Sequence, residues 1–254
     1  MTEQDFSAAV RPVFFHTDND DFLYATHGGT LFVVSFREKL YAVTCGHVFQ
    51  DFPYGMLFIT QEKFAKKGSM PAHVTGICHP SSPTDSLKGT DIGDICVLEF
   101  SDDTRPDFFK GSAYIIDEKT VATSKPGDEL FVAGVLKEKT TIDPPDISIG
   151  YCRLSFRDLG PTSDPILRKA FAVFGEALFG TLEFTSITGI SGAPVHNKTA
   201  NALCGMAIRG GMSGPACTIY YVDVFDIVRL LEAVSERAHS TYYTKLVAVP
   251  VRRP

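Results

Sequence analysis

The chain has 254 residues, a net charge of −6 and a pI near 5.6, and 44% of its residues are hydrophobic. These values fit one globular domain, or two smaller units that share a core. No basic stripe stands out, which argues against a nucleic acid partner. The start of the sequence, MTEQDFSAAV, lacks the features of a signal peptide, and no apolar run is long enough to span a membrane. We therefore expect a cytoplasmic protein with no membrane partner.

Short apolar runs separated by Gly, Pro, Asp and Asn follow one another along most of the chain. Such runs favour β-strands, and their number and spacing indicate an all-β sandwich or barrels. The predicted strands are Arg11–His16, Gly29–Arg37, Lys39–Thr44, Met56–Thr60, Ala72–Cys78, Asp94–Phe100, Glu129–Leu136, Ile147–Ser155, Ala177–Ser186, Ala193–His196, Ala202–Arg209 and Cys217–Val222. Between them, 80–89 and 155–168 are predicted surface loops, and 101–126 is a predicted connection between two halves.

One helix is predicted towards the end of the sequence. Asp223 is a suitable N-cap, with Asp226 three residues further on. The apolar residues that recur there at helical spacing are Val224, Ile227, Val228, Leu231 and Val234. This pattern predicts an amphipathic helix over about 223–238. The segment 242–251 is predicted to be extended, with no assigned place.

The cysteines give little sign of a disulfide or metal framework. Because no export signal is found, we expect all of them to be reduced and most to be buried. No CxxC pair occurs, so we expect no metal and no cofactor. Cys45 and His47, separated by one glycine, leave metal binding open as an alternative at that turn. The six cysteines are Cys45, Cys78, Cys96, Cys152, Cys204 and Cys217.

Three segments carry groups suited to nucleophilic catalysis. In YAVTCGHVF, an apolar strand ends in a turn of small residues that presents His47. In DIGDICVLEF, Asp94 stands at the start of an apolar strand, and in TGISGAP a glycine-flanked turn presents Ser191. Each segment is weak evidence alone. Together they have the His–Asp–Ser order that one of the convergent triad architectures uses.

With these segments the chain resembles the trypsin/chymotrypsin-like serine peptidase family, especially its bacterial, non-secreted members. TCGHV is similar to the family's T-A-x-H segment, DICVLEF to its D-I-A-L-L-x-L segment, and GISGAP to its G-x-S-G-x-P segment. LCGMAIRGG is similar to the strand that lines the substrate cleft. The resemblance covers about Gly28 to Val234. It implies a single domain with a chymotrypsin-like double β-barrel, at about 10–105 and 125–222, and a C-terminal α-helix.

The resemblance also implies a serine endopeptidase that acts on a protein or peptide substrate. His47 would be the general base, Asp94 would orient its imidazole, and Ser191 would be the nucleophile. The backbone N–H groups of Gly189 and Ser191 would form the oxyanion hole. Asp91 is a rival for Asp94, which is preferred because the residues after Asp94 reproduce the family's spacing.

Substrate preference is implied less directly. By the family's geometry, the base of the primary pocket lies about six residues before the nucleophile, at Thr185 with Ser186 beside it. Neither side chain is charged, so we expect a small or apolar residue to be bound there. Gly210 would leave the pocket mouth open. Arg209 is interpreted either as a solvated surface charge or as a partner for an acidic group of the substrate.

Other functions remain as hypotheses. The main alternative is a catalytically inactive trypsin-like domain that acts as a protein-binding module. An α/β-hydrolase would need the opposite order of triad residues and alternating helices. A cysteine peptidase is conceivable at Cys45, but this residue lies on the turn of the general base itself. Because Ile190 is apolar where zymogen-activated relatives carry an acid, that route of activation is not expected. A regulatory protein partner is a further hypothesis.

Overall fold

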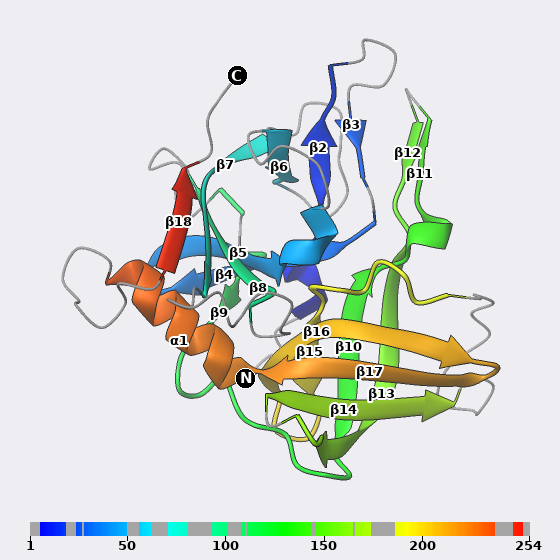
Figure 1. Ribbon diagram of the computed structural model, residues 1–254. Coiled ribbons are helices and arrows are strands. Elements are labelled where there is room, and N and C mark those ends of the chain that lie inside the picture. Colours follow the sequence, from blue (N-terminus) through cyan, green and yellow to red (C-terminus); the bar gives the residue numbers. More distant parts are fainter. Residues whose placement is uncertain are drawn as a thin grey trace.

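The computed structural model describes residues 6–18, 24–26, 28–49, 56–61, 71–80, 93–100, 108–109, 111–143, 146–164, 166–173, 186–236 and 246–250. Strands dominate these ranges. They form a large sheet and a closed barrel, which Figure 1 shows one above the other, and a separate two-stranded hairpin. Three short 3₁₀ helices, Phe6–Ala9, Gly46–Phe49 and Lys137–Lys139, and one α-helix complete the regular structure of the described chain. None of the described helices is both long and apolar enough to cross a bilayer.

The first sheet is built from the N-terminal part of the chain and one late strand. Its strands are β1 (Val10–Pro12), β2 (Phe14–His16), β3 (Tyr24–Ala25), β4 (Thr30–Phe36), β5 (Lys39–Cys45), β6 (Leu57–Thr60), β7 (Pro71–Pro80), β8 (Ile95–Phe100), β9 (Tyr114–Ile115) and β18 (Leu246–Pro250). Within the described ranges their order is β1-β4-β5-β8-β7-β6-β2-β3, while β9 pairs with β4 and β18 with β7.

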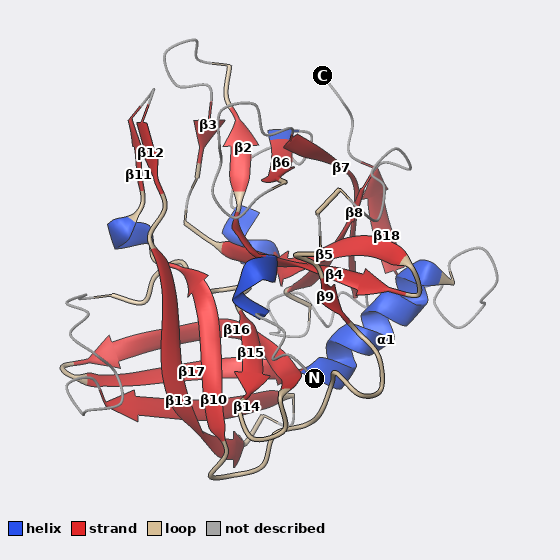
Figure 2. Ribbon diagram, turned by 180° about the vertical axis from the view of Figure 1, so that it is seen from behind, coloured by secondary structure: helices blue, strands red, loops and turns tan. Residues whose placement is uncertain are grey.

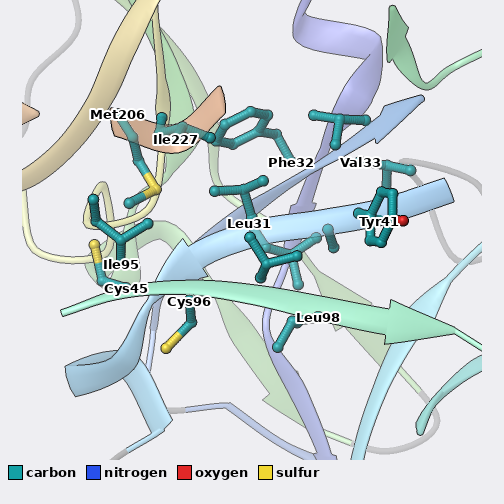
Figure 3. Packing of buried hydrophobic residues seen from close by; sticks show 14 of the residues in the cluster. Leu31, Phe32, Val33, Tyr41, Cys45, Ile95, Cys96, Leu98, Met206 and Ile227 are labelled. Carbon is teal, nitrogen blue, oxygen red and sulfur yellow. The ribbon is translucent and has the colours of Figure 1, made fainter. Parts of the chain in front are cut away.

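This sheet curves round on itself. β1 and β2 are separated by Val13 alone, yet β1 pairs with β4 and β2 pairs with β6. The chain from β1 to β2 thus joins the first strand of the path to the last but one, and the strands between them surround a common core. The core reaches beyond the sheet, because Met206 and Ile227 pack in the same cluster as Leu31 and Phe32 (Figure 3).

The second sheet is a closed barrel. Its strands are β10 (Glu129–Val135), β13 (Tyr151–Pro161), β14 (Leu167–Val173), β15 (Pro194–Asn197), β16 (Ala202–Ser213) and β17 (Ala216–Asp223), in the order β10-β13-β14-β17-β16-β15. Along β13 side chains alternate between the interior and the surface, as a half-buried strand requires. A hairpin of β11 (Thr141–Asp143) and β12 (Asp146–Ser148) projects from the end of the barrel (Figure 1).

Helix α1 (Val224–Ser235) contacts strands of both sheets. Asp223 caps it by accepting a hydrogen bond from the N–H of Phe225. Its buried face packs against β16 and β17 of the barrel and against β7 and β8 of the first sheet, and Figure 2 shows it beside the first sheet. The predicted helix is therefore confirmed, with its last residue at Ser235 instead of about 238.

The prediction of a surface loop over 155–168 is wrong. β13 continues to Pro161 and β14 begins at Leu167. The sequence suggested a loop because Asp158 and Gly160 are typical of turns. Asp158 is in fact buried, where its carboxylate accepts a 2.6 Å hydrogen bond from Arg168, and the strand bulges between Asp158 and Gly160.

Smaller differences concern three other segments. The predicted strand Ile147–Ser155 is divided into β12 and β13. The connection 101–126 contains β9 and a bridge from Val121 to Leu203. The extended segment expected over 242–251 supplies β18, which adds to β7. Residues 177–185 and 81–89 lie outside the described residues, so the predictions made for them have no counterpart here.

Candidate active site

His47 and Asp94 are brought together by the pairing of two neighbouring strands. β5 and β8 are antiparallel with Cys45 opposite Ile95. Because His47 follows the end of β5 and Asp94 precedes the start of β8, both lie at the same edge of the sheet. The N–H of Gly46 donates to the backbone oxygen of Asp94 at 2.7 Å, which fixes the turn between them.

The Asp94 carboxylate contacts His47 twice. Oδ2 lies 2.5 Å from Nδ1 of the ring, and Oδ1 accepts a 2.8 Å hydrogen bond from the His47 backbone N–H. This arrangement favours a proton on Nδ1 and leaves Nε2 as the basic nitrogen. The side chain of His47 is 49% exposed and that of Asp94 is 19% exposed, so the imidazole faces solvent and the acid stands behind it. Asp91 lies outside the described residues.

Ser191 lies in a tightly bonded turn before β15. Its backbone oxygen accepts a 2.9 Å hydrogen bond from the N–H of Thr30, and the N–H of Gly192 donates to Ala207 at 2.8 Å. Gly192 has a φ of 85°, and a Cβ at this position would meet the Thr30 oxygen at 1.9 Å. Only glycine fits this close approach of the turn to β4.

His47 and Ser191 line one pocket of about 450 Å³. Among the described residues, no hydrogen bond joins the Ser191 hydroxyl to the His47 ring. Catalytic hydrogen bonds are often long before substrate binds and tighten in the complex. The structure thus places His47 and Ser191 in the same pocket. The other lining residues are Gly28, Val48, Lys137, Ser186, Ile187, Thr188, Gly189, Ile190, Ile208, Arg209, Gly210, Gly211 and Met212.

The backbone at Gly189 offers donors next to Ser191. Within the described part of the chain, neither the N–H of Gly189 nor that of Ser191 donates to a protein oxygen. The neighbouring carbonyls are engaged, since Thr188 O accepts from the N–H of Lys137 and Gly189 O from the hydroxyl of Thr30. Two free N–H groups beside a hydroxyl are the arrangement that stabilises an oxyanion.

Thr30 is a site residue that the sequence did not reveal. Its buried Oγ1 donates to Gly189 O at 2.7 Å and accepts from the N–H of Val135 at 2.9 Å. Together with its N–H bond to Ser191 O, this threonine ties the Ser191 turn to both sheets. The only signal in the sequence is a hydroxyl directly before an apolar run, LFVV, which is common at the start of any strand.

Three of the four predicted specificity residues line the pocket. Ser186, Arg209 and Gly210 line it, whereas Thr185 lies outside the described residues. The hydroxyl of Ser186 accepts a 3.0 Å hydrogen bond from the N–H of Thr188, so it also shapes the turn. Lys137 lines the pocket too, and sequence analysis did not single it out.

The pocket side of β16 has an edge without a strand partner in the described chain. β15 pairs with β16 only as far as Met206, whereas β17 pairs with the other edge as far as Ser213. The residues from Ile208 to Met212 line the pocket. This part of β16 can accept an extended peptide as an added strand.

Cys45 lies behind the pair of His47 and Asp94. Donor atoms of these three residues lie within 4.8 Å of one another, so they form a set that could hold a metal ion. The Cys45 thiol is fully buried and donates to Ala207 O at 3.4 Å, and it does not line the pocket. This position makes Cys45 unsuited to be a nucleophile. All six cysteines are free and buried in the structure, which confirms the expectation that most are buried.

Comparisons with known proteins identify the fold that carries this site. No family model and no curated protein matches the sequence. Among solved structures, the thermostable serine protease AL20 from an extremophilic microorganism matches with a TM-score of 0.54 and 14% identity, over 90% of this chain and 97% of that one. Human heparin binding protein gives 0.57 and 13%, over 93% and 94%. The chain has the chymotrypsin-like fold.

Not every protein of the chymotrypsin-like fold that matches is an active enzyme. The scabies mite inactivated protease paralogue S-I1 gives a TM-score of 0.58 with 16% identity, over 93% of this chain and 97% of that one. At such identities the likeness establishes the fold, and with it the predicted all-β architecture. The function must be argued from the site.

Proposed function

We propose that this chymotrypsin-like chain is a serine endopeptidase that works through an acyl-enzyme. The observation that carries the proposal is the Asp94–His47 pair, which faces the same pocket as Ser191 beside two unpaired N–H groups. These are the base, the orienting acid, the nucleophile and the oxyanion donors that acyl transfer requires.

The reaction follows from these positions. A peptide binds along the part of β16 that lines the pocket, with its scissile carbonyl at Ser191. Nε2 of His47 takes the hydroxyl proton as Oγ attacks the carbonyl carbon, and the N–H groups of Gly189 and Ser191 stabilise the negative oxygen. His47 then gives the proton to the leaving amine, and water repeats the sequence on the ester. Asp94 holds the Nδ1 proton and stabilises the imidazolium.

The pocket beside Ser191 supports the preference for a small or apolar residue before the scissile bond. Ser186, Ile187 and Ile208 line it, and the described lining residues include no Asp or Glu. A substrate Lys or Arg would therefore find no carboxylate partner among them. This preference remains part of the proposal, because Thr185 lies outside the described residues.

A protein-binding module without catalysis is the second candidate. Two observations favour it, namely the missing hydrogen bond between the Ser191 hydroxyl and His47 and the match to an inactivated paralogue. The module would use the same pocket and the same β16 edge to bind peptides without cleaving them.

Hydrolysis of an unfolded protein separates the two functions. We expect the wild type to cleave denatured casein, and Ser191→Ala and His47→Ala to lower the rate by at least about three orders of magnitude. Ser155→Ala, in β13 away from the pocket, is the matched control and should keep the wild-type rate. Cleavage by Ser191→Ala at the wild-type rate, or no cleavage by the wild type, would contradict the proposal.

A further inference from the structure

Two cationic residues stand on opposite sides of the nucleophile turn. In the barrel, β15 lies between β10 and β16, and the Ser191 turn leads into β15. Lys137 follows the end of β10, and its N–H donates to Thr188 O at 2.8 Å. Arg209 lies three residues beyond Met206, which pairs with Pro194 at the start of β15. Both cations therefore reach the same end of β15, one from each side.

Each cation is held at the pocket by its neighbours. The stem of Lys137 packs against Gly28, where a Cβ would meet the Lys137 Cβ at 2.7 Å. The guanidinium of Arg209 lies over the Tyr220 ring, 5.2 Å from its centre. Both residues line the pocket of Ser191.

The pocket is positive in the described structure. Its charged lining residues are Lys137 and Arg209, and no carboxylate is among the described residues that line it. A hollow lined by one sign of charge concentrates ligands of the opposite sign. The overall charge of the chain is −6, so this local excess of positive charge runs against the rest of the molecule.

The positive charge continues beyond Arg209. A second hollow of about 580 Å³ is lined by Arg209, Lys169 and Tyr220, among others. The Lys169 ammonium lies 6.0 Å from the centre of the Tyr220 ring that also carries Arg209. Asp164 also lines this hollow, and its carboxylate accepts a hydrogen bond from the N–H of Ile166. A peptide that leaves the pocket over Arg209 thus meets a second cation.

We propose that the site selects peptides with an acidic residue in the flank on each side of the scissile bond, outside the small or apolar residue that directly precedes the bond. This inference rests on the proposed function, since a chain that passes over Ser191 must cross from the Lys137 side to the Arg209 side. A substrate carboxylate on one side meets Arg209, and one on the other side meets Lys137. The interactions act at a solvated rim, so each should change the specificity constant by a factor of only about three to five and weaken with salt.

A matched peptide set tests this selectivity. Quenched fluorescent peptides with one common scissile bond carry Gln on both flanks, Glu on one flank, Glu on the other, Glu on both, or Lys on both. We expect kcat/KM to rise about tenfold from the Gln peptide to the peptide with Glu on both flanks, and to be lower for the Lys peptide than for the Gln peptide. The differences between the peptides should become small at high ionic strength.

Variants assign each flank to its cation. Arg209→Gln should abolish the preference for Glu on one flank, and Lys137→Gln the preference on the other. Lys125→Gln makes the same change of charge at the opposite end of β10 and should leave both preferences intact. Equal rates for all peptides with the wild type, or an equal effect of Lys125→Gln, would overturn the inference. Melting temperatures show that each variant is folded.

Binding measurements on an inactive variant test the selectivity independently of hydrolysis. Fluorescence anisotropy of the same peptides with Ser191→Ala should give the same order of affinity, with the same loss in the double variants that add Arg209→Gln or Lys137→Gln. If the wild type cleaves none of the peptides while Ser191→Ala prefers the acidic ones, the proposed peptidase function fails and the acidic selectivity stands. If cleavage occurs without any preference for Glu, the selectivity fails and the peptidase function stands.

Discussion

The carboxylate of Asp94 holds His47 at two points, the backbone N–H and the ring Nδ1. The first contact fixes the position of the turn, and the second fixes the orientation and the tautomer of the imidazole. Both follow from the register that sets Cys45 opposite Ile95 in β5 and β8. The geometry of the His47–Asp94 pair is therefore a property of the first sheet alone.

Asp94→Asn should separate the structural role of this residue from its chemical role. The amide oxygen can still accept from the His47 N–H, but the amide nitrogen would donate to Nδ1 and impose the wrong tautomer. We expect kcat to fall by about three to four orders of magnitude. The free energy of unfolding should change by about 1 kcal/mol or less. A variant with wild-type kcat, measured on a casein or peptide substrate, would show that Asp94 is not the orienting acid.

Gly189→Ala should damage the donor pair beside Ser191. With φ at 107°, an added Cβ would lie 2.4 Å from Val135 O, so the turn must move. We expect a loss of about two to three orders of magnitude in kcat. Gly127→Ala is the control, because Gly127 has a φ of 96° but nothing within 4 Å of the added Cβ. It should cost about 1 kcal/mol of stability and leave kcat unchanged.

Thr30→Val should test whether this threonine positions the nucleophile turn. The change keeps the shape but leaves Gly189 O and the Val135 N–H without their hydroxyl partner. We expect a loss of about 1–3 kcal/mol in stability, and a fall in kcat with little change in KM. Thr30→Ser retains the hydroxyl, so it should keep most of the wild-type stability and most of the wild-type kcat. Equal kcat for the two variants would mean that Thr30 acts on stability alone.

His196 should make stability depend on pH. The ring is buried in the barrel wall and stacks on Phe6 with centres 4.5 Å apart, and its Nδ1 has no partner among the described residues. Burial, and then the charge of Arg153, lowers the pKa of His196 from 6.5 to about 4. At pH values between these two, His196 is protonated in the unfolded chain and neutral in the folded chain.

Stability should accordingly fall as the pH drops from about 6.5 to about 4, by about 3 kcal/mol from this group. His196→Phe keeps the stack on Phe6 and removes the titration. Urea unfolding at about pH 7 and about pH 5 should show a smaller loss for the variant than for the wild type. The same loss in both proteins would contradict this account of His196.

The thiols should be inert in the folded protein. Burial is the main cause that raises the pKa of Cys217 to about 12, and it also raises the pKa values of Cys96 and Cys204. Because the thiolate is the reactive form, alkylation should be slow without denaturant and should leave hydrolysis intact. Titration with a chromogenic disulfide should find all six thiols in denaturant. Rapid loss of activity on alkylation would point instead to a reactive cysteine at the site.

Sequence analysis predicted the elements that carry strong periodicity or motifs. The strands around His47 and Ser191 and the helix capped by Asp223 lie close to their predicted places. The failures have a common physical cause, because they concern polar residues satisfied by distant partners. Asp158 is typical of a turn in the sequence, but in the structure it is a buried partner of Arg168. Thr30 acts through hydrogen bonds to groups more than a hundred residues away. Pairings of this kind leave no local pattern in a sequence.

The cations at the pocket illustrate the same limit. Arg209 is the last residue of the predicted cleft strand Ala202–Arg209, whereas Lys137 stands among polar residues after β10. Only closure of the barrel brings Lys137 to the opposite side of Ser191. A single sequence gives the residues of such a surface but not their neighbours.

The central claim is that the Ser191 hydroxyl is an activated nucleophile. Its most direct test is to treat the folded protein with an active-site-directed fluorophosphonate, measure the intact mass, and map the modified peptide. The account predicts one adduct per chain, on Ser191, which disappears in Ser191→Ala and forms at least about a thousandfold more slowly in His47→Ala. An adduct on another residue, or none on the wild type, would contradict it.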